Sequence, residues 1–395
     1  MKKTLLATAL ACVCATASAA DNHKVGVLLS FTGPIESLTP DMAGSAEMAF
    51  QEANDSGLLL GGATLEPVRG DATCVDSAAG TAAAERLITS DNVVAIMGAD
   101  CSGVTTAVAN NTGVPNGVVM VSPSATSPAL STIDDKGLFF RTAPSDARQG
   151  ELLADILIKR GMKSVAVTYT NNDYGKGLAD SFSTIYEALG GKVEITAAHE
   201  DGKADYSAEV AALSASGAEH LAVFGYVDQG GKGIVQAAID TDAFQSFVFG
   251  DGMIGESILE SVGSDLDGSV IGTVSGSDSS DAMMFNDLAK ATGVTGDGPY
   301  RGESYDAAAL IVLAIQAGGS ADRASIQANI MNVANAPGEE IGPGELFKAL
   351  KILADGGEVN YQGATSIELN DVGETKGSYK ELEVEGGKFK TVQVH

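Results

Sequence analysis

Residues 93–126 read VVAIMGADCSGVTTAVANNTGVPNGVVMVSPSAT, and this stretch contains two apolar runs, 93–97 and 118–121, each followed by small polar residues. Each run predicts a short buried strand, and the pattern between them, 104–111, predicts a helix. A strand, a crossover helix and a second strand place the two strands in parallel. The polar residues after each strand are therefore expected at the same edge of one sheet.

Two polar segments at this edge, 101–105 (CSGVT) and 122–126 (SPSAT), are candidate binding segments. Unpaired N–H groups and the partial positive charge of a helix N-terminus bind a small carboxylate without a cationic side chain. Serine and threonine are also ordinary helix caps, and either segment alone has that simpler interpretation. The pairing of the two segments is what predicts a site.

The same alternation of strand and helix continues on both sides of this stretch. In the first half, strands are expected at 25–30, 65–69, 93–97 and 118–121, with helices at 43–54, 78–88 and 104–111. A second series has helices at 149–160 and 177–188 and strands at 164–169, 193–198, 221–224 and 247–249. A strand at 270–274, helices at 283–292 and 303–318, and short antiparallel strands after Tyr361 complete the pattern. The fold class is α/β with two doubly wound parallel sheets.

Length and charge limit the possible functions. The chain has 395 residues, which is too long for one ordinary core and predicts two domains. It carries 52 acidic and 24 basic side chains, a net charge of −28 that becomes −30 if Lys2 and Lys3 are removed. The acidic residues are spread along the chain, so we interpret them as a solvated surface. Nucleic acid and anionic lipid are excluded as partners on these grounds.

The first twenty residues resemble a secretory signal peptide. Lys2 and Lys3 precede an apolar stretch at 5–15, and Ala-Ser-Ala at 17–19 provides a small-residue cleavage site. We therefore expect residues 1–20 to be removed and the mature chain to be located in the periplasm. Lipid anchoring through Cys12 or Cys14 is the alternative, although neither has the usual Leu-x-x spacing upstream. No later apolar run approaches the length of a membrane span.

Two cysteines, Cys74 and Cys101, remain after the predicted cleavage. Both follow predicted strands, at 65–69 and 93–97, that are joined by a helical crossover, so both are expected at the carboxyl ends of parallel strands. An oxidising compartment favours a disulfide between them. A zinc or catalytic role is disfavoured because no histidine lies nearby.

Motifs typical of enzymes are absent from the sequence. The first strand is followed by Ser-Phe-Thr-Gly-Pro at 30–34 and not by Gly-x-Gly-x-x-Gly, and the glycine-rich segment 225–233 lacks the lysine of a P-loop. The four histidines, at 23, 199, 220 and 395, have no metal-ligand spacing, and no Gly-x-Ser-x-Gly occurs. We therefore expect no enzymatic activity, no cofactor and no metal site. The lack of tryptophan disfavours a sugar ligand.

These features together resemble the type I periplasmic solute-binding proteins of the leucine/isoleucine/valine-binding group. The resemblance extends over the mature chain, from VGVLLSFTGP at 25–34 through the two polar segments to DYGKG at 173–177. It implies two lobes joined by three crossovers, near 141–144, 273–277 and 357–362. The first lobe would comprise 21–142 and 276–358, and the second 143–275 and 359–395.

The resemblance also assigns ligand-binding residues. In the first lobe, Ser102 and Thr126 would hold a ligand carboxylate, and the carbonyl of Ser124 would accept from a ligand ammonium, with Ala125 in the same binding segment. Phe31, just after the first strand, is a candidate for the wall of an apolar pocket, although core packing is an alternative.

In the second lobe, Tyr174 and Tyr226 would close over the ligand. Asp251 occupies the position of a glutamate that holds the ammonium in amino-acid binders of this group, and is one methylene shorter. Outside the resemblance, the two tyrosines are interpretable as loop-edge aromatics, and Asp251-Gly252 is a common turn pair.

The resulting hypothesis is an extracytoplasmic receptor of an ABC importer that captures a small aliphatic amino acid by lobe closure. Its expected partners are a membrane permease and an ATPase, and the protein itself is expected to be a monomer. The alternatives are a binder of small carboxylates without an amine, aromatic acids included, or of amides or urea. A ligand-sensing regulator with the same fold is a further alternative.

Overall fold

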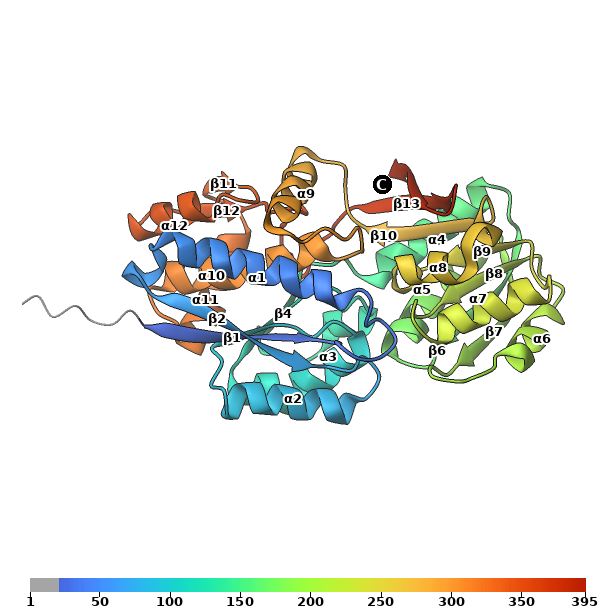
Figure 1. The fold of residues 1–395 in the computed structure, drawn as a ribbon, viewed down its shortest axis with the longest axis horizontal. Coiled ribbons are helices and arrows are strands. Elements are labelled where there is room, and N and C mark those ends of the chain that lie inside the picture. The colour runs from blue at the N-terminus through green and yellow to red at the C-terminus, as the bar shows by residue number, and fades with distance from the viewer. Residues whose placement is uncertain (1–20) are drawn as a thin grey trace, which may run out of the picture.

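The structure is a computed structural model that describes residues 21–395. Its two large sheets, each flanked by helices, lie at opposite ends of an elongated molecule (Figure 1). The predicted signal peptide, with Cys12 and Cys14, lies outside the described residues. Within 21–395, no helix combines the length and apolar character needed to cross a membrane.

The first sheet is parallel throughout, with strand order β2-β1-β3-β4-β5. Its strands are β1 (Asn22–Leu29), β2 (Thr64–Asp71), β3 (Ala95–Gly98), β4 (Val119–Ser122) and β5 (Phe139–Arg141). Every residue of β3 and β4 is buried, because helices cover both faces of a parallel sheet. Its helices are α1 (Thr39–Ser56), α2 (Ser77–Thr89), α3 (Ser102–Val108), α9 (Ser280–Thr292), α10 (Arg301–Gly318), α11 (Arg323–Ala334) and α12 (Leu346–Ala354). We call this unit the first lobe.

The second sheet has the order β14-β13-β10-β9-β8-β6-β7. Its parallel strands are β6 (Ser164–Thr170), β7 (Lys192–His199), β8 (His220–Phe224), β9 (Ser246–Phe249) and β10 (Val270–Ser275). The antiparallel hairpin of β13 (Tyr379–Val384) and β14 (Phe389–Val394) extends it, as expected from the tail sequence. Its helices are α4 (Asp146–Lys159), α5 (Asp173–Ala188), α6 (Ser207–Ser214), α7 (Gly230–Asp240) and α8 (Glu256–Val262). We call this unit the second lobe, and the prediction of two doubly wound sheets is confirmed.

A small sheet and several short helical segments complete the secondary structure. A two-stranded parallel sheet pairs β11 (Glu339–Ile341) with β12 (Val359–Tyr361). Short 3-10 or π segments lie at Leu59–Gly61, Ala109–Gly113, Val114–Asn116, Pro128–Thr132, Asp251–Met253 and Gly263–Leu266.

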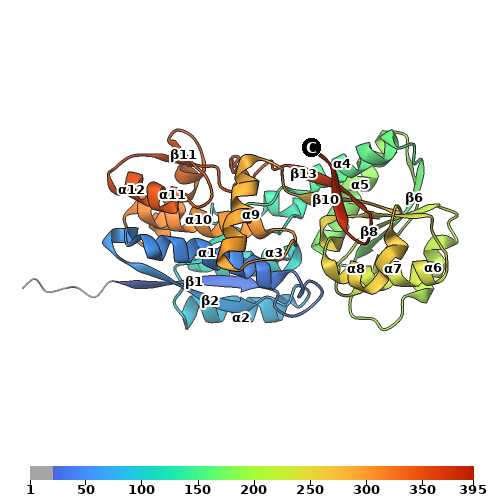
Figure 2. The ribbon, with the colours of Figure 1, turned by 45° about the horizontal axis from the view of Figure 1, so that its top comes forward.

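Helix α10 is the centre of the first lobe. Residues 303–316 are all buried, the run 307–315 is entirely apolar, and the helix packs against α1, α11 and α12 (Figure 2). A helix that is apolar around its whole circumference is a core helix. After β10, the chain thus returns to the first lobe, as the sequence predicts.

Three connections join the lobes. The first links β5 to α4 and the second links β10 to α9, both close to the expected crossovers at 141–144 and 273–277. The third lies after residue 375 and before β13. The expected crossover at 357–362, and with it the boundary at 358, is therefore wrong.

Contacts of residues 359–375 explain this correction. β12 pairs with β11, the Asp306 carboxylate accepts from the Ala364 and Thr365 N–H groups at 2.8 and 2.9 Å, and Asn335 exchanges two hydrogen bonds with the Leu369 backbone. These bonds hold the segment on the first lobe until it crosses to β13.

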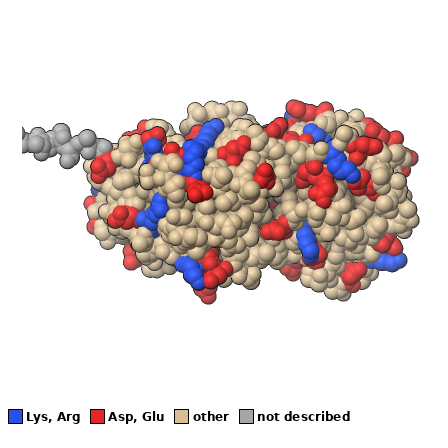
Figure 3. Space-filling model, turned by 90° about the horizontal axis from the view of Figure 1, so that it is seen from below, with Lys and Arg blue, Asp and Glu red and all other residues tan. Residues whose placement is uncertain are grey.

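On the face drawn in Figure 3, acidic side chains are scattered over both lobes and not gathered into one block. On the face drawn there, single basic side chains lie between them. This distribution agrees with the expected solvated acidic surface.

Candidate functional site

A cavity of about 30 Å³ lies where the two lobes meet, at the carboxyl ends of strands β3, β4, β8 and β9. It is lined by Ile35, Leu38, Met42, Asp100, Cys101, Ser102, Ser124, Thr126 and Tyr300 of the first lobe and by Tyr174, Tyr226, Asp251 and Gly252 of the second. Six of the residues predicted from the sequence meet here: Ser102, Ser124, Thr126, Tyr174, Tyr226 and Asp251. A larger groove, of about 900 Å³ between α9 and the β13–β14 hairpin, contains none of these six.

The two polar segments of the first lobe lie side by side at the cavity. The Ser127 N–H donates to Ser102 Oγ at 3.1 Å, and Ser124 Oγ donates to the Asp100 carbonyl at 3.1 Å. Because Ser102 Oγ accepts in this contact, its own hydrogen can be donated to a ligand. The expected gathering of hydroxyl groups at one sheet edge is thus present.

Asp251 is the centre of the second-lobe wall. Asp251 follows β9 and is only 2% exposed. Its Oδ1 accepts hydrogen bonds from Tyr174 Oη and from the Gly252 N–H, both at 2.7 Å. Its Oδ2 accepts from the hydroxyl of Tyr300, which belongs to the first lobe. The carboxylate therefore joins the two lobes through tyrosine hydroxyls.

Gly252 is required beside Asp251. A Cβ at this position would lie 2.6 Å from the Gly225 carbonyl oxygen and 2.9 Å from Tyr174 Oη. The Asp251-Gly252 pair is therefore explained by close packing at the site as well as by turn formation.

Three buried carboxyl groups give this region its electrostatic character. Burial raises the pKa of Asp251, of Asp100 and of Asp146, and the charge of Asp251 raises the pKa of Asp146 further. Asp100 accepts from Ser30 Oγ at 2.7 Å and from the Cys101 N–H at 2.9 Å, whereas the oxygens of Asp146 have no hydrogen-bond partner among the described residues. Among residues 21–395, neither lysine nor arginine lines the cavity. The raised pKa values mean that burial disfavours the charged form of these carboxyl groups.

Aromatic and aliphatic side chains form the remaining walls. The rings of Tyr174 and Tyr226 stack with centroids 5.2 Å apart, and both are nearly buried. Burial raises the pKa of both hydroxyls well above the usual value, so they remain neutral donors. Ile35, Leu38 and Met42 line the cavity from the first lobe. These groups form an apolar compartment beside the polar ones.

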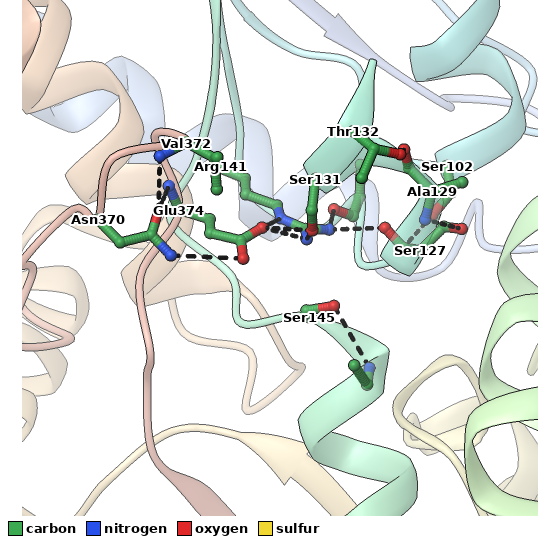
Figure 4. Close-up of polar contacts among 12 residues, drawn as sticks. Ser102, Ser127, Ala129, Ser131, Thr132, Arg141, Ser145, Asn370, Val372 and Glu374 are labelled. Atoms are coloured by element: carbon green, nitrogen blue, oxygen red, sulfur yellow. Dashed lines mark hydrogen bonds and ion pairs between the residues drawn. The ribbon is translucent and has the colours of Figure 1, made fainter. Parts of the chain in front are cut away.

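Arg141 fixes the second polar segment from behind (Figure 4). Its side chain is 1% exposed, and its Nη1 donates to the carbonyls of Ala125 and Ser127, both at 3.0 Å. Its other donors reach Ser131 Oγ and the Glu374 carboxylate. Burial acts to raise the pKa of Glu374, but the Arg141 guanidinium outweighs this effect and lowers it. The ion pair also joins the end of β5, just before the first connection, to the segment just before the third.

Two predicted site residues do not reach the cavity wall. Ala125 is fully buried, and its carbonyl and N–H groups bond to Arg141 and to Ser122 Oγ. Phe31 packs under the guanidinium of Arg69, 5.2 Å from the ring centroid. Phe31 lies after the end of β1 and is not among the residues that line the cavity. The expectation that Phe31 lines the pocket is therefore not met.

Other cavity residues were missed by the sequence analysis. Ile35, Leu38 and Met42 have the spacing of one helix face, which is a usable signal. Tyr300 has a left-handed backbone, with φ of 63°, directly before α10. Its sequence position gives no sign that it reaches Asp251, 49 residues earlier.

A disulfide joins Cys74 and Cys101, with the Cα atoms 5.1 Å apart. This confirms the pairing expected from the sequence. Cys101 itself lines the cavity and directly precedes Ser102, so the bond anchors the first polar segment to the loop after β2.

Comparison with known proteins decides the family. A family model described as periplasmic binding protein matches residues 23–348. The chain belongs to this family. A Leu/Ile/Val-binding protein homolog 3 of Brucella melitensis is 32% identical over 256 residues, which cover 63% of this chain and 66% of the relative.

Solved structures share the fold of this periplasmic binding protein. LivJ, a branched-chain amino acid transporter substrate binding protein of Streptococcus pneumoniae in complex with isoleucine, has a TM-score of 0.79 and 21% identity, covering 95% of this chain and 99% of that one. A solute binding protein of an ABC transporter from R. palustris in complex with 4-hydroxybenzoate has a TM-score of 0.76 and 23% identity, covering 95% and 97%.

Family membership confirms the resemblance found in the sequence. A periplasmic binding protein is a solute-binding protein and not an enzyme, and it acts outside the cytoplasm. The two parallel-sheet lobes are those of the type I fold.

Proposed function

We propose that this protein is the receptor component of an ABC importer and captures a small aliphatic α-amino acid between its lobes. The observation that carries the proposal is Asp251, a buried carboxylate at a cavity that no lysine or arginine of the described part of the chain lines. A ligand ammonium would bind Asp251 through a charge-assisted hydrogen bond.

The opposite side of the cavity supports the same ligand class. Ser102 and Thr126 supply hydroxyl groups suited to a carboxylate, which is the other end of an α-amino acid, and the Ser124 carbonyl would accept from the ammonium. Between the two ends, the stacked tyrosines and the aliphatic residues suit a short apolar side chain. The relative from Brucella, named for leucine, isoleucine and valine, supports this choice.

A second candidate ligand is a small carboxylate without an amine. It is favoured by the three donors that already satisfy Asp251: the hydroxyls of Tyr174 and Tyr300 and the Gly252 N–H. A carboxylate with this many partners does not require an ammonium. The 4-hydroxybenzoate complex of the R. palustris protein supports an aromatic acid as this alternative.

Location and partners follow from the same proposal. We propose that residues 1–20 direct export to the periplasm and that the mature protein, as a monomer, delivers its ligand to a membrane permease driven by an ATPase. The corrected lobe boundaries would be 21–142 with 276–375, and 143–275 with 376–395.

Thermal unfolding of the mature protein tests the ligand class. The panel contains L-leucine, L-isoleucine and L-valine, the deaminated leucine analogue 4-methylpentanoate, 4-hydroxybenzoate, and urea with simple amides. A ligand that binds only the folded state adds about 2.7 kcal/mol of stability at 100 times its Kd. Stabilisation by an amino acid and not by 4-methylpentanoate supports the proposal. The reverse result selects the amine-free alternative.

A further inference from the structure

The two lobes are also joined at the rim of the cavity by a pair of hydrogen bonds outside its lining. The Asp228 N–H donates to the Pro34 carbonyl at 3.0 Å, and the Ser37 N–H donates to Asp228 Oδ2 at 2.8 Å. Pro34 and Ser37 follow β1 in the first lobe, whereas Asp228 follows β8 in the second. We call this pair of bonds the rim clasp.

The rim clasp ties together two loops that carry cavity residues. Ile35 lies between its two first-lobe partners, and Leu38 directly follows one of them. On the other side, Tyr226 precedes Asp228 by two residues. None of the clasp residues belongs to the three connections between the lobes. The clasp therefore adds a link between the lobes that is separate from the hinge.

We propose that Asp228 is a positioning residue that holds the first-lobe loop, with Ile35 and Leu38, closed over the ligand. The inference rests on the proposed function, since it assumes that a ligand occupies the cavity. Asp228 is not among the residues that line the cavity. Its effect is expected on how long the closed state lasts, and hence on ligand release.

Three variants distinguish this positioning role from a general loss of folded structure. Asp228→Ala removes the acceptor for the Ser37 N–H, whereas Asp228→Asn keeps an oxygen in the same place. Asp240→Ala is the matched control, because Asp240 ends α7 in the same lobe and accepts only from Gln236, at 2.9 Å, among the described contacts.

Stopped-flow kinetics with L-leucine provide the first measurement. For Asp228→Ala we expect the dissociation rate to rise 3–10-fold, the range of one hydrogen bond, with an association rate within twofold of wild type. Asp228→Asn and Asp240→Ala should stay within twofold in both rates. A dissociation rate unchanged in Asp228→Ala, or raised equally in Asp228→Asn, overturns the proposal.

Hydrogen exchange of the backbone provides a second measurement, made at saturation with whichever ligand of the thermal-unfolding panel stabilises the protein, because the clasp forms only when the lobes are closed. In wild type and in Asp228→Asn, the Ser37 amide should exchange more slowly than in Asp228→Ala, by the same 3–10-fold. Equal exchange in all variants overturns the clasp. If L-leucine fails to bind wild type while this difference is present, the ligand assignment fails and the clasp stands.

Discussion

The carboxylate of Asp251 is held by hydroxyl groups from opposite lobes, Tyr174 from the second and Tyr300 from the first. A ligand ammonium placed beside it would add a charged partner to an already ordered group. In the proposed function, Asp251 therefore responds both to lobe closure and to the charge of the ligand.

Asp251→Asn should distinguish the two ligand classes. Removing one partner of a buried charged pair costs about 2–5 kcal/mol, so L-leucine should bind at least roughly 30-fold more weakly. 4-Methylpentanoate should bind equally well or better, because its carboxylate is no longer repelled by Asp251. Calorimetric titration of both ligands against both proteins gives the comparison. Leucine affinity within about threefold of wild type contradicts the proposed pairing.

The pH dependence of binding should have opposite signs for the two ligands. Burial raises the pKa of Asp251 above its usual value of 3.8, and a bound ammonium lowers it again. The free protein therefore takes up a proton at a higher pH than the leucine complex does. As pH falls through the raised pKa, leucine affinity should fall, whereas that of 4-methylpentanoate should rise until its own carboxyl group is protonated. Titrations between pH 7 and about pH 4 check this, and a parallel response of both ligands contradicts it.

At the residue scale, the sequence predicted the polar end of the site better than its walls. Ser102 and Thr126 were identifiable because each lies just after a predicted strand, where parallel sheets bind ligands. Tyr300 was not, since its contact with Asp251 depends on a left-handed backbone and on the meeting of two lobes. Phe31 was misplaced because the direction of a side chain after a strand end depends on the local turn.

At the scale of elements, the Cys74–Cys101 disulfide links the loop after β2 to the start of α3. The bond closes a loop with a sequence separation of 27 residues, which stabilises the fold by about 3–4 kcal/mol in the chain-entropy estimate. The double variant Cys74→Ser, Cys101→Ser should lose this amount in urea unfolding.

Thiol counting provides the control for this prediction. Unfolded, unreduced mature protein should have no reactive sulfhydryl, and reduced protein should unfold at the same urea concentration as the double variant. Two reactive thiols before reduction would show that the pairing does not form.

Strand and helix positions were predictable because their apolar periodicity is local, and most expected elements lie within a few residues of the observed ones. The segment 359–375 was not, because long-range hydrogen bonds to Asp306 and Asn335 hold it on the first lobe. The apolar periodicity of a segment gives no information on such long-range hydrogen bonds. The third connection was consequently expected too early in the chain.

At the scale of the whole molecule, the cavity residues come from both lobes, so a ligand can enter only when the lobes separate. The connections after β5, after β10 and before β13 must absorb the change in backbone angles. Small-angle scattering should therefore give a smaller radius of gyration at saturation with ligand than without it. An identical profile in both conditions indicates a rigid pocket and contradicts the hinge.

The scattered acidic surface has a consequence for the kinetics of capture. With a net charge of −28, the protein repels anions at long range, and this repulsion weakens as the Debye length falls from about 30 Å at 0.01 M salt to about 10 Å at 0.1 M. A zwitterion has no net charge, so its association rate should hardly depend on ionic strength. An anionic acid should associate faster as salt is added. In dilute surroundings, the outer surface of this protein therefore discriminates against anions before they reach the cleft.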